Sequence, residues 1–300
     1  MEASQATLAA PDAVGGWRTV VADYVALTKP KVQSLLLLTT VCTMEVAGDP
    51  SVGLIALTVV GGYLSAGGAG AVNHWYDRDI DAQMPRTANR PVPAGRVAPR
   101  AALTYGVVLA LLSFVLLTAT VNLLAASLAF SGFLGYVFVY TVWLKRRTPQ
   151  NIVIGGAAGA IPPLVGWAAV TGELAGMPIY LFAIVFFWTP PHFWALSLLM
   201  KKEYERVGVP MLPVVRGEQE TRKQILLYSV LLWAVTQLPF CAGGLGTLYL
   251  VCSLALGALF IAGAVVLYRR ADRRSALRLY LFSLAYLALL FGAMVLDVKV

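Results

Sequence analysis

Charged residues are scarce in this sequence. Asp, Glu, Lys and Arg together make up 13% of its 300 residues, whereas about a quarter of the residues of a typical soluble domain are charged. Hydrophobic residues make up 59% of the chain, and the mean hydropathy is +0.74. This composition excludes a water-soluble enzyme and indicates a polytopic membrane protein.

Cysteine and histidine are rare as well. The three cysteines, Cys42, Cys241 and Cys252, all lie inside apolar runs, with no CxxC pair and no group of histidines beside them. The sequence therefore indicates neither a disulfide framework nor a zinc site. We interpret the cysteines as lipid-facing or packing residues.

Apolar runs of about 20 residues recur along the chain, and each is long enough to cross ~30 Å of hydrocarbon. A segment exposed to lipid must satisfy its own backbone hydrogen bonds, so these runs should be helices. We predict an all-α bundle of nine transmembrane helices, with a helical lead-in that begins near Trp17. The predicted spans are 32–47, 51–76, 101–121, 123–144, 151–170, 177–200, 224–243, 246–268 and 276–296.

Residues 1–16 differ from the rest because they are mostly small and polar. They lack the basic start and apolar centre of a secretory signal, so we expect a mobile N-terminal tail and no cleaved leader. Residues 17–300 are predicted to form a single transmembrane domain.

The basic residues are distributed very unevenly between the connections. Every lysine and arginine except Lys299 precedes the first predicted span, lies in a connection after the second, fourth, sixth or eighth span, or, in the case of Arg278, lies at the start of the ninth span. By the positive-inside rule, the N-terminus is expected in the cytoplasm and the C-terminus outside, in the cell membrane. The net charge of +8 thus reflects topology, and no nucleic-acid partner is expected.

The end of the second predicted span carries an acidic motif. Asn73, Asp77 and Asp81 follow one another at four-residue spacing, which puts three oxygen ligands on one helical face. Such ligands suit Mg²⁺, which also takes phosphate oxygens from a substrate. Asp79 lies on the opposite face and receives no ligand role. The alternative is a solvated acidic helix end that nearby arginines neutralise.

Basic residues on the same side of the membrane are candidates for binding a diphosphate. Arg86 and Arg90 supply planar guanidinium groups that suit phosphate. Lys31 and Lys145 are the candidates that we select from two further basic clusters, at 29–31 and 145–147. The alternative for all of them is an ordinary set of topology anchors.

Two further polar residues are weaker candidates. Glu203, in the second long connection, offers another carboxylate and therefore a second metal contact. His192 follows two prolines in the middle of the sixth span, where an ionisable residue points to function. Its alternative role is a hydrogen bond between packed helices. For His74, beside the acidic face, we favour packing.

At this point the motifs resemble those of a known family. The acidic motif and the basic stretch after it resemble the signature of the UbiA superfamily of intramembrane aromatic prenyltransferases. Four further blocks resemble its protohaem-farnesylating branch, and the likeness extends from about residue 23 to residue 297. Glu203 is the single acidic position left where other members carry DxxxD. The matching strings are Asn73-x3-Asp77-x3-Asp81, Arg86-Thr87-x2-Arg90-Pro91-x-Pro93-x-Gly95, and the blocks 144–152, 155–168, 191–196 and 208–215.

The resemblance implies a nine-helix bundle with a central cavity that opens toward the cytoplasmic side. It implies that farnesyl diphosphate binds Mg²⁺ held by three catalytic residues, Asn73, Asp77 and Asp81. Arg78 joins the diphosphate-binding residues, and His192 becomes a haem contact. The reaction would add the farnesyl group and water to a vinyl group of haem B, which gives haem O. A haem A synthase or an oxidase assembly factor would then be a partner.

Two other functions remain open at the level of sequence. A prenyltransferase that acts on an aromatic quinone precursor would keep the same acidic face and basic loops, although the blocks around Gly155 and His192 argue against it. A membrane carrier could also be built from nine helices with Gly and Pro interruptions. It fits less well, because the acidic face lies at a helix end and not at mid-bilayer.

Overall fold

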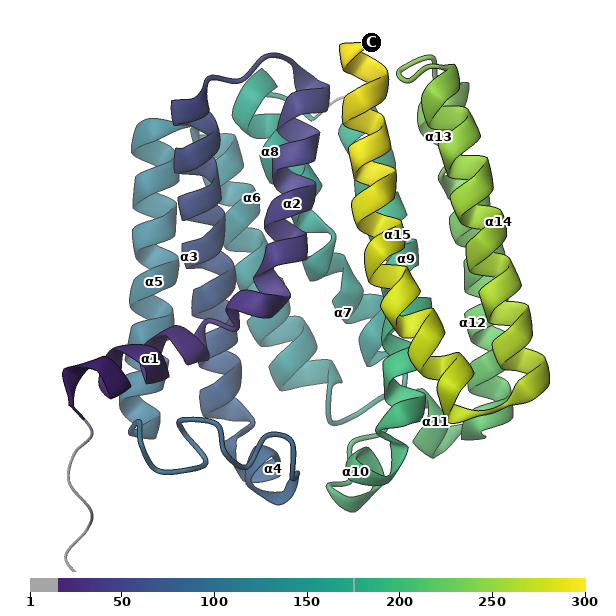
Figure 1. Cartoon of the computed structure of the whole chain (residues 1–300). Coiled ribbons are helices and arrows are strands. Elements are labelled where there is room, and N and C mark those ends of the chain that lie inside the picture. The colour runs from purple at the N-terminus through teal and green to yellow at the C-terminus, as the bar shows by residue number, and fades with distance from the viewer. Residues whose placement is uncertain (1–15, 175) are drawn as a thin grey trace, which may run out of the picture.

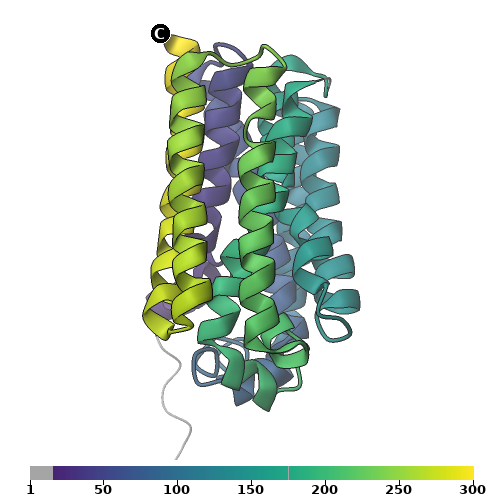
Figure 2. The same ribbon diagram turned by 90° about the vertical axis from the view of Figure 1, so that its right-hand side faces the viewer.

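The computed structural model describes residues 16–174 and 176–300, and every regular element within these ranges is helical. The predicted tail over 1–16 therefore lies, except for Gly16, outside the described residues. Long helices stand side by side along one axis (Figures 1 and 2), and Figure 1 shows α1 running across the bundle toward the end that holds α4. The elements are α1 (Trp17–Leu27), α2 (Pro30–Ala47), α3 (Val52–Tyr76), α4 (Arg78–Gln83), α5 (Pro99–Thr120), α6 (Leu123–Leu134), η1 (Gly135–Leu144), α7 (Asn151–Gly159), α8 (Ile161–Thr171), α9 (Met177–Leu199), α10 (Lys201–Arg206), α11 (Leu212–Val215), α12 (Gly217–Val235), α13 (Leu238–Cys241), α14 (Thr247–Arg270) and α15 (Arg273–Lys299).

Eight helical stretches in the described part of the chain are long and apolar enough to cross a membrane, so this is a multi-pass membrane protein. They correspond to the second to ninth predicted spans. The first predicted span corresponds to α2, an 18-residue helix that stands in the bundle but is not among the eight. It carries Lys31 and Glu45 near its ends, which lowers its apolar character.

The predicted spans over 151–170 and 123–144 are not single regular helices. The span over 151–170 divides into α7 and α8 at Ala160, just before Pro162 and Pro163. The span over 123–144 changes from α6 to the wider π-helix η1, a feature that often marks functional sites. Hydropathy cannot reveal either change, because both segments remain apolar throughout.

Glycines allow the helices to approach closely. A Cβ atom built on Gly68 of α3 would lie 2.5 Å from the carbonyl oxygen of Gly106 on α5. Gly166 of α8 lies in the same way against the Thr40 carbonyl of α2. These small residues bring backbones together, as is usual in membrane helices, and hold α2, α3, α5 and α8 as one half of the bundle.

The two long connections meet at one end of the bundle. Figure 1 shows α4 and α10 at the end crossed by α1, with the C-terminus at the opposite end. Ile80 and Met84 from the first connection share an apolar cluster with Tyr204 and Met211 from the second. The two long connections are therefore structured, and they pack against each other at this end of the bundle.

Candidate active site

The predicted acidic face forms where α3 meets α4. α3 ends at Tyr76, yet the backbone N–H of Asp77 still donates to Asn73 O at 2.9 Å, and that of Asp81 donates to Asp77 O at 2.8 Å. The helical spacing of Asn73, Asp77 and Asp81 is thus confirmed across the junction. All three residues are buried, with at most 3% of each residue's surface exposed.

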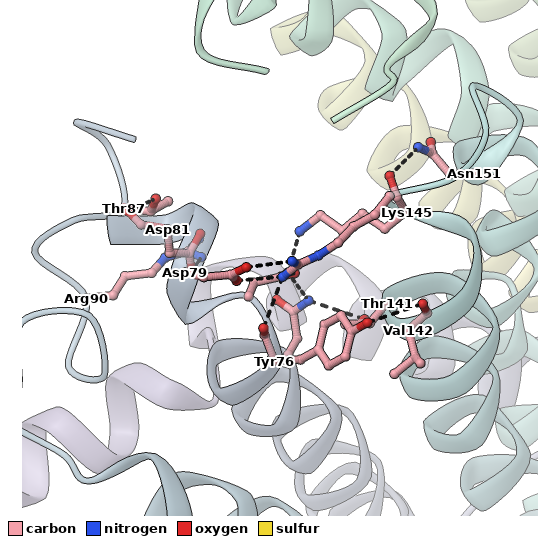
Figure 3. A network of polar contacts seen from close by, with 12 residues as sticks. Tyr76, Asp79, Asp81, Thr87, Arg90, Thr141, Val142, Lys145 and Asn151 are labelled. Atoms are coloured by element: carbon pink, nitrogen blue, oxygen red, sulfur yellow. Dashed lines mark hydrogen bonds and ion pairs between the residues drawn. The ribbon is translucent and has the colours of Figure 1, made fainter. Parts of the chain in front are cut away.

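Asp77 takes part in a network of polar contacts with residues that include Lys145, which is labelled in Figure 3. The Asp77 carboxylate accepts hydrogen bonds from Asn73 Nδ2 at 2.6 Å and from the Lys145 ammonium, and Arg146 Nη2 lies 3.4 Å from its other oxygen. Asn73 Nδ2 also donates to Thr141 Oγ1 at 3.2 Å, an acceptor that η1 supplies. A fully buried carboxylate is costly without such partners, so the negative charge is matched within the site.

Lys29 is a site residue that we did not select from the basic cluster at 29–31. It stands between α1 and α2 in a left-handed backbone conformation, with φ at 56°, and its Nζ donates to Asn73 Oδ1 at 2.6 Å. Burial, together with the charges of Arg90 and Lys145, lowers its pKa from 10.5 to about 7. Lys31, which we selected, is exposed. The sequence feature that distinguishes Lys29 is the proline that follows it. A residue before proline is disfavoured in the helical backbone conformation, so the chain is expected to turn at Lys29.

The basic loop folds back onto the acidic face. Arg90 Nη1 lies 2.6 Å from Asp81 Oδ2, and the Thr87 hydroxyl donates to the Asp81 carbonyl at 2.9 Å. Arg90, which the sequence analysis selected as a diphosphate-binding residue, therefore lies beside the carboxylate of Asp81.

Arg146 is the second residue that sequence reasoning passed over. It binds Asp79 through two hydrogen bonds of 2.6 and 2.7 Å and covers the ring of Tyr76 at 4.9 Å. The hydrogen bonds from Arg146 lower the pKa of Asp79, and this partner in turn raises the pKa of Arg146. Asp79 thus orients a cation toward Asp77, although it lies outside the acidic face.

A pocket of about 310 Å³ lies next to these contacts. Its lining includes four cationic side chains and a histidine that has no hydrogen-bond partner on either ring nitrogen among the described residues. This concentration of positive charge suits an anion such as a phosphate. The lining residues are Ala26, Lys29, His74, Arg86, Asn89, Arg90, Pro91 and Arg96.

Arg78, another predicted diphosphate-binding residue, lies at the surface. Arg78 is exposed, donates to the Trp75 carbonyl at 2.7 Å and lies 5.7 Å from the centre of the Trp75 ring. The structure therefore brings Arg86, Arg90 and Lys145 to the site region and leaves Arg78 and Lys31 at the surface.

The donor set fits Mg²⁺ in its chemistry. Asn73, Asp77 and Asp81 offer hard oxygen ligands, and one carboxylate oxygen of Glu203 is buried without a partner among the described residues. In the described part of the chain, no three His, Cys, Asp or Glu residues form a ready-made metal cluster. The carboxylates are instead turned to separate cations, Asp77 to Lys145 and Asp81 to Arg90.

Comparison with known proteins shows the family to which the chain belongs. The model of the UbiA prenyltransferase family matches residues 35–290. The "Protoheme IX farnesyltransferase" of Symbiobacterium thermophilum is 56% identical over 283 residues, which cover 93% of this chain and 95% of that protein. The protein of the same name from Chloroflexus aurantiacus is 55% identical over 94% of this chain, and the chain spans about half of its length, 48%.

Solved structures show the same fold at low sequence identity. A digeranylgeranylglyceryl phosphate synthase matches with a TM-score of 0.77 and 18% identity, over 93% of this chain and 99% of that one. A UbiA homologue from Archaeoglobus fulgidus bound to DMAPP and Mg²⁺ matches with a TM-score of 0.66 and 16% identity, over 91% of this chain and 99% of that one. The chain belongs to the UbiA prenyltransferase family.

Proposed function

We propose that this protein transfers the farnesyl group of farnesyl diphosphate to a vinyl group of protohaem IX, with addition of water, to give haem O and diphosphate. The observation that carries the proposal is the buried pair of Asn73 and Asp77, surrounded by Lys29, Lys145 and Arg146. The choice of acceptor rests on relatives of that activity that are more than half identical to the chain.

We also propose that the protein lies in the cell membrane with nine transmembrane helices. We count α2 as a transmembrane helix in addition to the eight apolar stretches, because it stands in the bundle and packs against α8 through Gly166. The end that holds α4 and α10 faces the cytoplasm, since the basic connections are expected on that side. The active-site cavity opens there, and the C-terminus lies outside.

The acidic face would hold Mg²⁺ through Asn73, Asp77 and Asp81, with Glu203 as a further contact. The ion supplies Lewis-acid stabilisation of the charge that develops on the leaving diphosphate. Arg86, Arg90 and Lys145 bind the diphosphate oxygens, and Lys31 and Arg78 belong to the outer part of this basic set. Lys145 lies beside Asp77, and Arg90 lies beside Asp81. Both cations would therefore be close to a diphosphate bound at these carboxylates.

The chain's own residues then protect and direct the reacting carbon. Departure of diphosphate leaves positive charge on the farnesyl group, which aromatic faces stabilise. The candidate aromatic residues are Tyr140, whose ring centre lies 5.3 Å from that of Tyr136, and Trp75 and Tyr76 at the end of α3. The vinyl group attacks the farnesyl carbon, and water adds to the resulting cation with loss of one proton. No protein nucleophile is required.

The test is mass analysis of haem after the purified protein is incubated in detergent with protohaem, farnesyl diphosphate and Mg²⁺. The expected product is heavier by one farnesyl group and one water, and a chelator or Asp77→Ala abolishes it. Conversion of an aromatic quinone precursor in place of haem would establish the alternative acceptor. Transport of haem across vesicles without any new product would establish a carrier.

A further inference from the structure

A second groove of about 240 Å³ lies between α14 and α15, and its lining shares no residue with the acidic site or the pocket beside it. Figure 1 shows these two helices side by side, joined at the end of the bundle that holds α10. Leu259 and Val266 are two helical turns apart, so the groove runs about 10 Å along α14. The lining that matters below is Leu259, Gly263 and Val266 of α14 and Arg278, Leu279 and Phe282 of α15.

Most of the groove is apolar and open to the surroundings of the bundle. Leu259 is 58% exposed and Val266 42% exposed, although both belong to a helix long and apolar enough to cross the membrane. A Cβ atom on Gly263 would lie 3.2 Å from Leu279 Cδ1, so the glycine leaves room between the helices. Exposed apolar walls of this kind are suited to a hydrocarbon chain.

Arg278 places a positive charge in the lining of the groove. It is exposed in the second turn of α15, and no other charged residue follows it along this helix until Asp297. None of the ion pairs between described residues includes Arg278. An arginine at the edge of the hydrocarbon without a carboxylate partner is expected to reach toward lipid headgroups.

The turn between α14 and α15 adds to this charge. It carries four more exposed arginines, at positions 269, 270, 273 and 274. The single carboxylate among them, Asp272, accepts a hydrogen bond from the Ser275 backbone N–H at 2.7 Å and caps α15. A basic segment of this kind at the end of membrane helices attracts anionic headgroups, and guanidinium groups fit phosphate oxygens.

We propose that the groove between α14 and α15 binds one anionic phospholipid, with its phosphate at Arg278 and an acyl chain along Gly263 and Leu259. A free phosphate would leave the apolar walls uncovered. A second copy of the chain, related by a two-fold axis at this face, would bring two sets of arginines together. The proposal depends on neither farnesyl diphosphate nor haem, so it stands or falls apart from the proposed function.

The experiment is native mass spectrometry of the whole protein in detergent with phosphatidylglycerol or phosphatidylcholine. The wild type should bind one phosphatidylglycerol about 10-fold more tightly than phosphatidylcholine, because choline would bring a positive charge to the arginines. Arg278→Gln should abolish this preference. Arg274→Gln makes the same charge change outside the groove and should preserve it. Equal losses in the two variants, or no preference in the wild type, would overturn the proposal.

A second pair of variants tests the apolar part of the groove. Gly263→Leu should fill it and weaken the binding of both lipids, whereas Ala262→Leu, at an exposed position outside the lining, should not. Added phosphatidylglycerol should raise the unfolding temperature of the wild type and of Ala262→Leu, but not of Arg278→Gln. Arg278 is exposed, so its substitution keeps the test decisive if Gly263→Leu does not fold.

The other occupants give different results. Displacement of phosphatidylglycerol by excess inorganic phosphate would indicate a site for a free anion. A dimer that contains no lipid and that Gly263→Leu dissociates would indicate a second copy of the chain. Either result would overturn the proposal of a phospholipid site.

Discussion

At the scale of single residues, the site depends on a buried carboxylate whose charge is matched by cations from distant parts of the chain. Asp77 is fully buried, and Lys145 and Arg146 both reach it from beyond η1. Asp79 is two residues away and binds the same arginine, but its side chain is 56% exposed. The two aspartates therefore form a matched pair for mutation.

Asp77→Asn should reduce farnesyl transfer by about 100-fold or more, because it removes a charge on which the reaction centre is built. Asp79→Asn should reduce it only a few-fold, since Arg146 keeps its contact with Asp77. The measurement is the rate of haem product formation at saturating Mg²⁺. Equal losses in the two variants would show that Arg146, and not the buried carboxylate, is the critical group.

A second matched pair is Lys29 and Lys31. Lys29→Met should lower the catalytic efficiency toward farnesyl diphosphate about 10- to 100-fold, because a charged hydrogen bond to Asn73 is lost. Lys31→Met should change it little, since Lys31 is exposed. Steady-state kinetics with varied farnesyl diphosphate measures both. The reverse order would support the choice that the sequence alone favoured.

At the scale of elements, close approach of helices depends on individual glycines. Gly166 and Gly159 lie on α8 and α7, the two halves of one predicted span. An added Cβ would collide with the Thr40 carbonyl at Gly166, whereas it would meet no atom within 4 Å at Gly159. Only the first position should therefore control how α2 packs.

Gly166→Ala should destabilise the protein by about 1–3 kcal/mol, the usual cost of an overpacked contact. Gly159→Ala should be neutral or slightly stabilising, because alanine favours a helix and has room. Unfolding of the two variants in detergent, followed by circular dichroism, measures the difference. Destabilisation by Gly159→Ala would show that α7 approaches a neighbour more closely than the structure indicates.

At the scale of the whole molecule, the distribution of charge separates the two ends of the bundle. Lys299 near the C-terminus binds Asp49 at 2.6 Å and Glu45 at 3.2 Å, far from the end that holds α4 and α10. The remaining basic connections lie at the other end. This polarity decides the orientation that we propose.

The orientation is tested by labelling single cysteines after Cys42, Cys241 and Cys252 are replaced. Asp49→Cys should react with a membrane-impermeant maleimide in intact cells, because the α2–α3 connection is expected outside. Gln219→Cys, exposed at the start of α12, should react only after permeabilisation. Labelling of the two positions in the reverse order would invert the topology.

Much of the fold was predictable because it depends on local properties. The length of the apolar runs determines which segments are helices in a membrane, and eight of the nine predicted spans correspond to stretches long and apolar enough to cross it. The four-residue spacing of Asn73, Asp77 and Asp81 also persists, since it needs only helical backbone. The family relation predicted from these motifs is confirmed by the match over residues 35–290.

The sequence by itself thus determined the membrane class, the helical elements, the acidic face and the family. Only the tertiary structure decided that Lys29 contacts Asn73, that Arg146 joins Lys145 at Asp77, and that Ser283 holds His192. These pairs join segments far apart in the chain. They depend on a left-handed turn, a π-helix and the packing of α9 on α15, and none of these leaves a trace in hydrophobic periodicity.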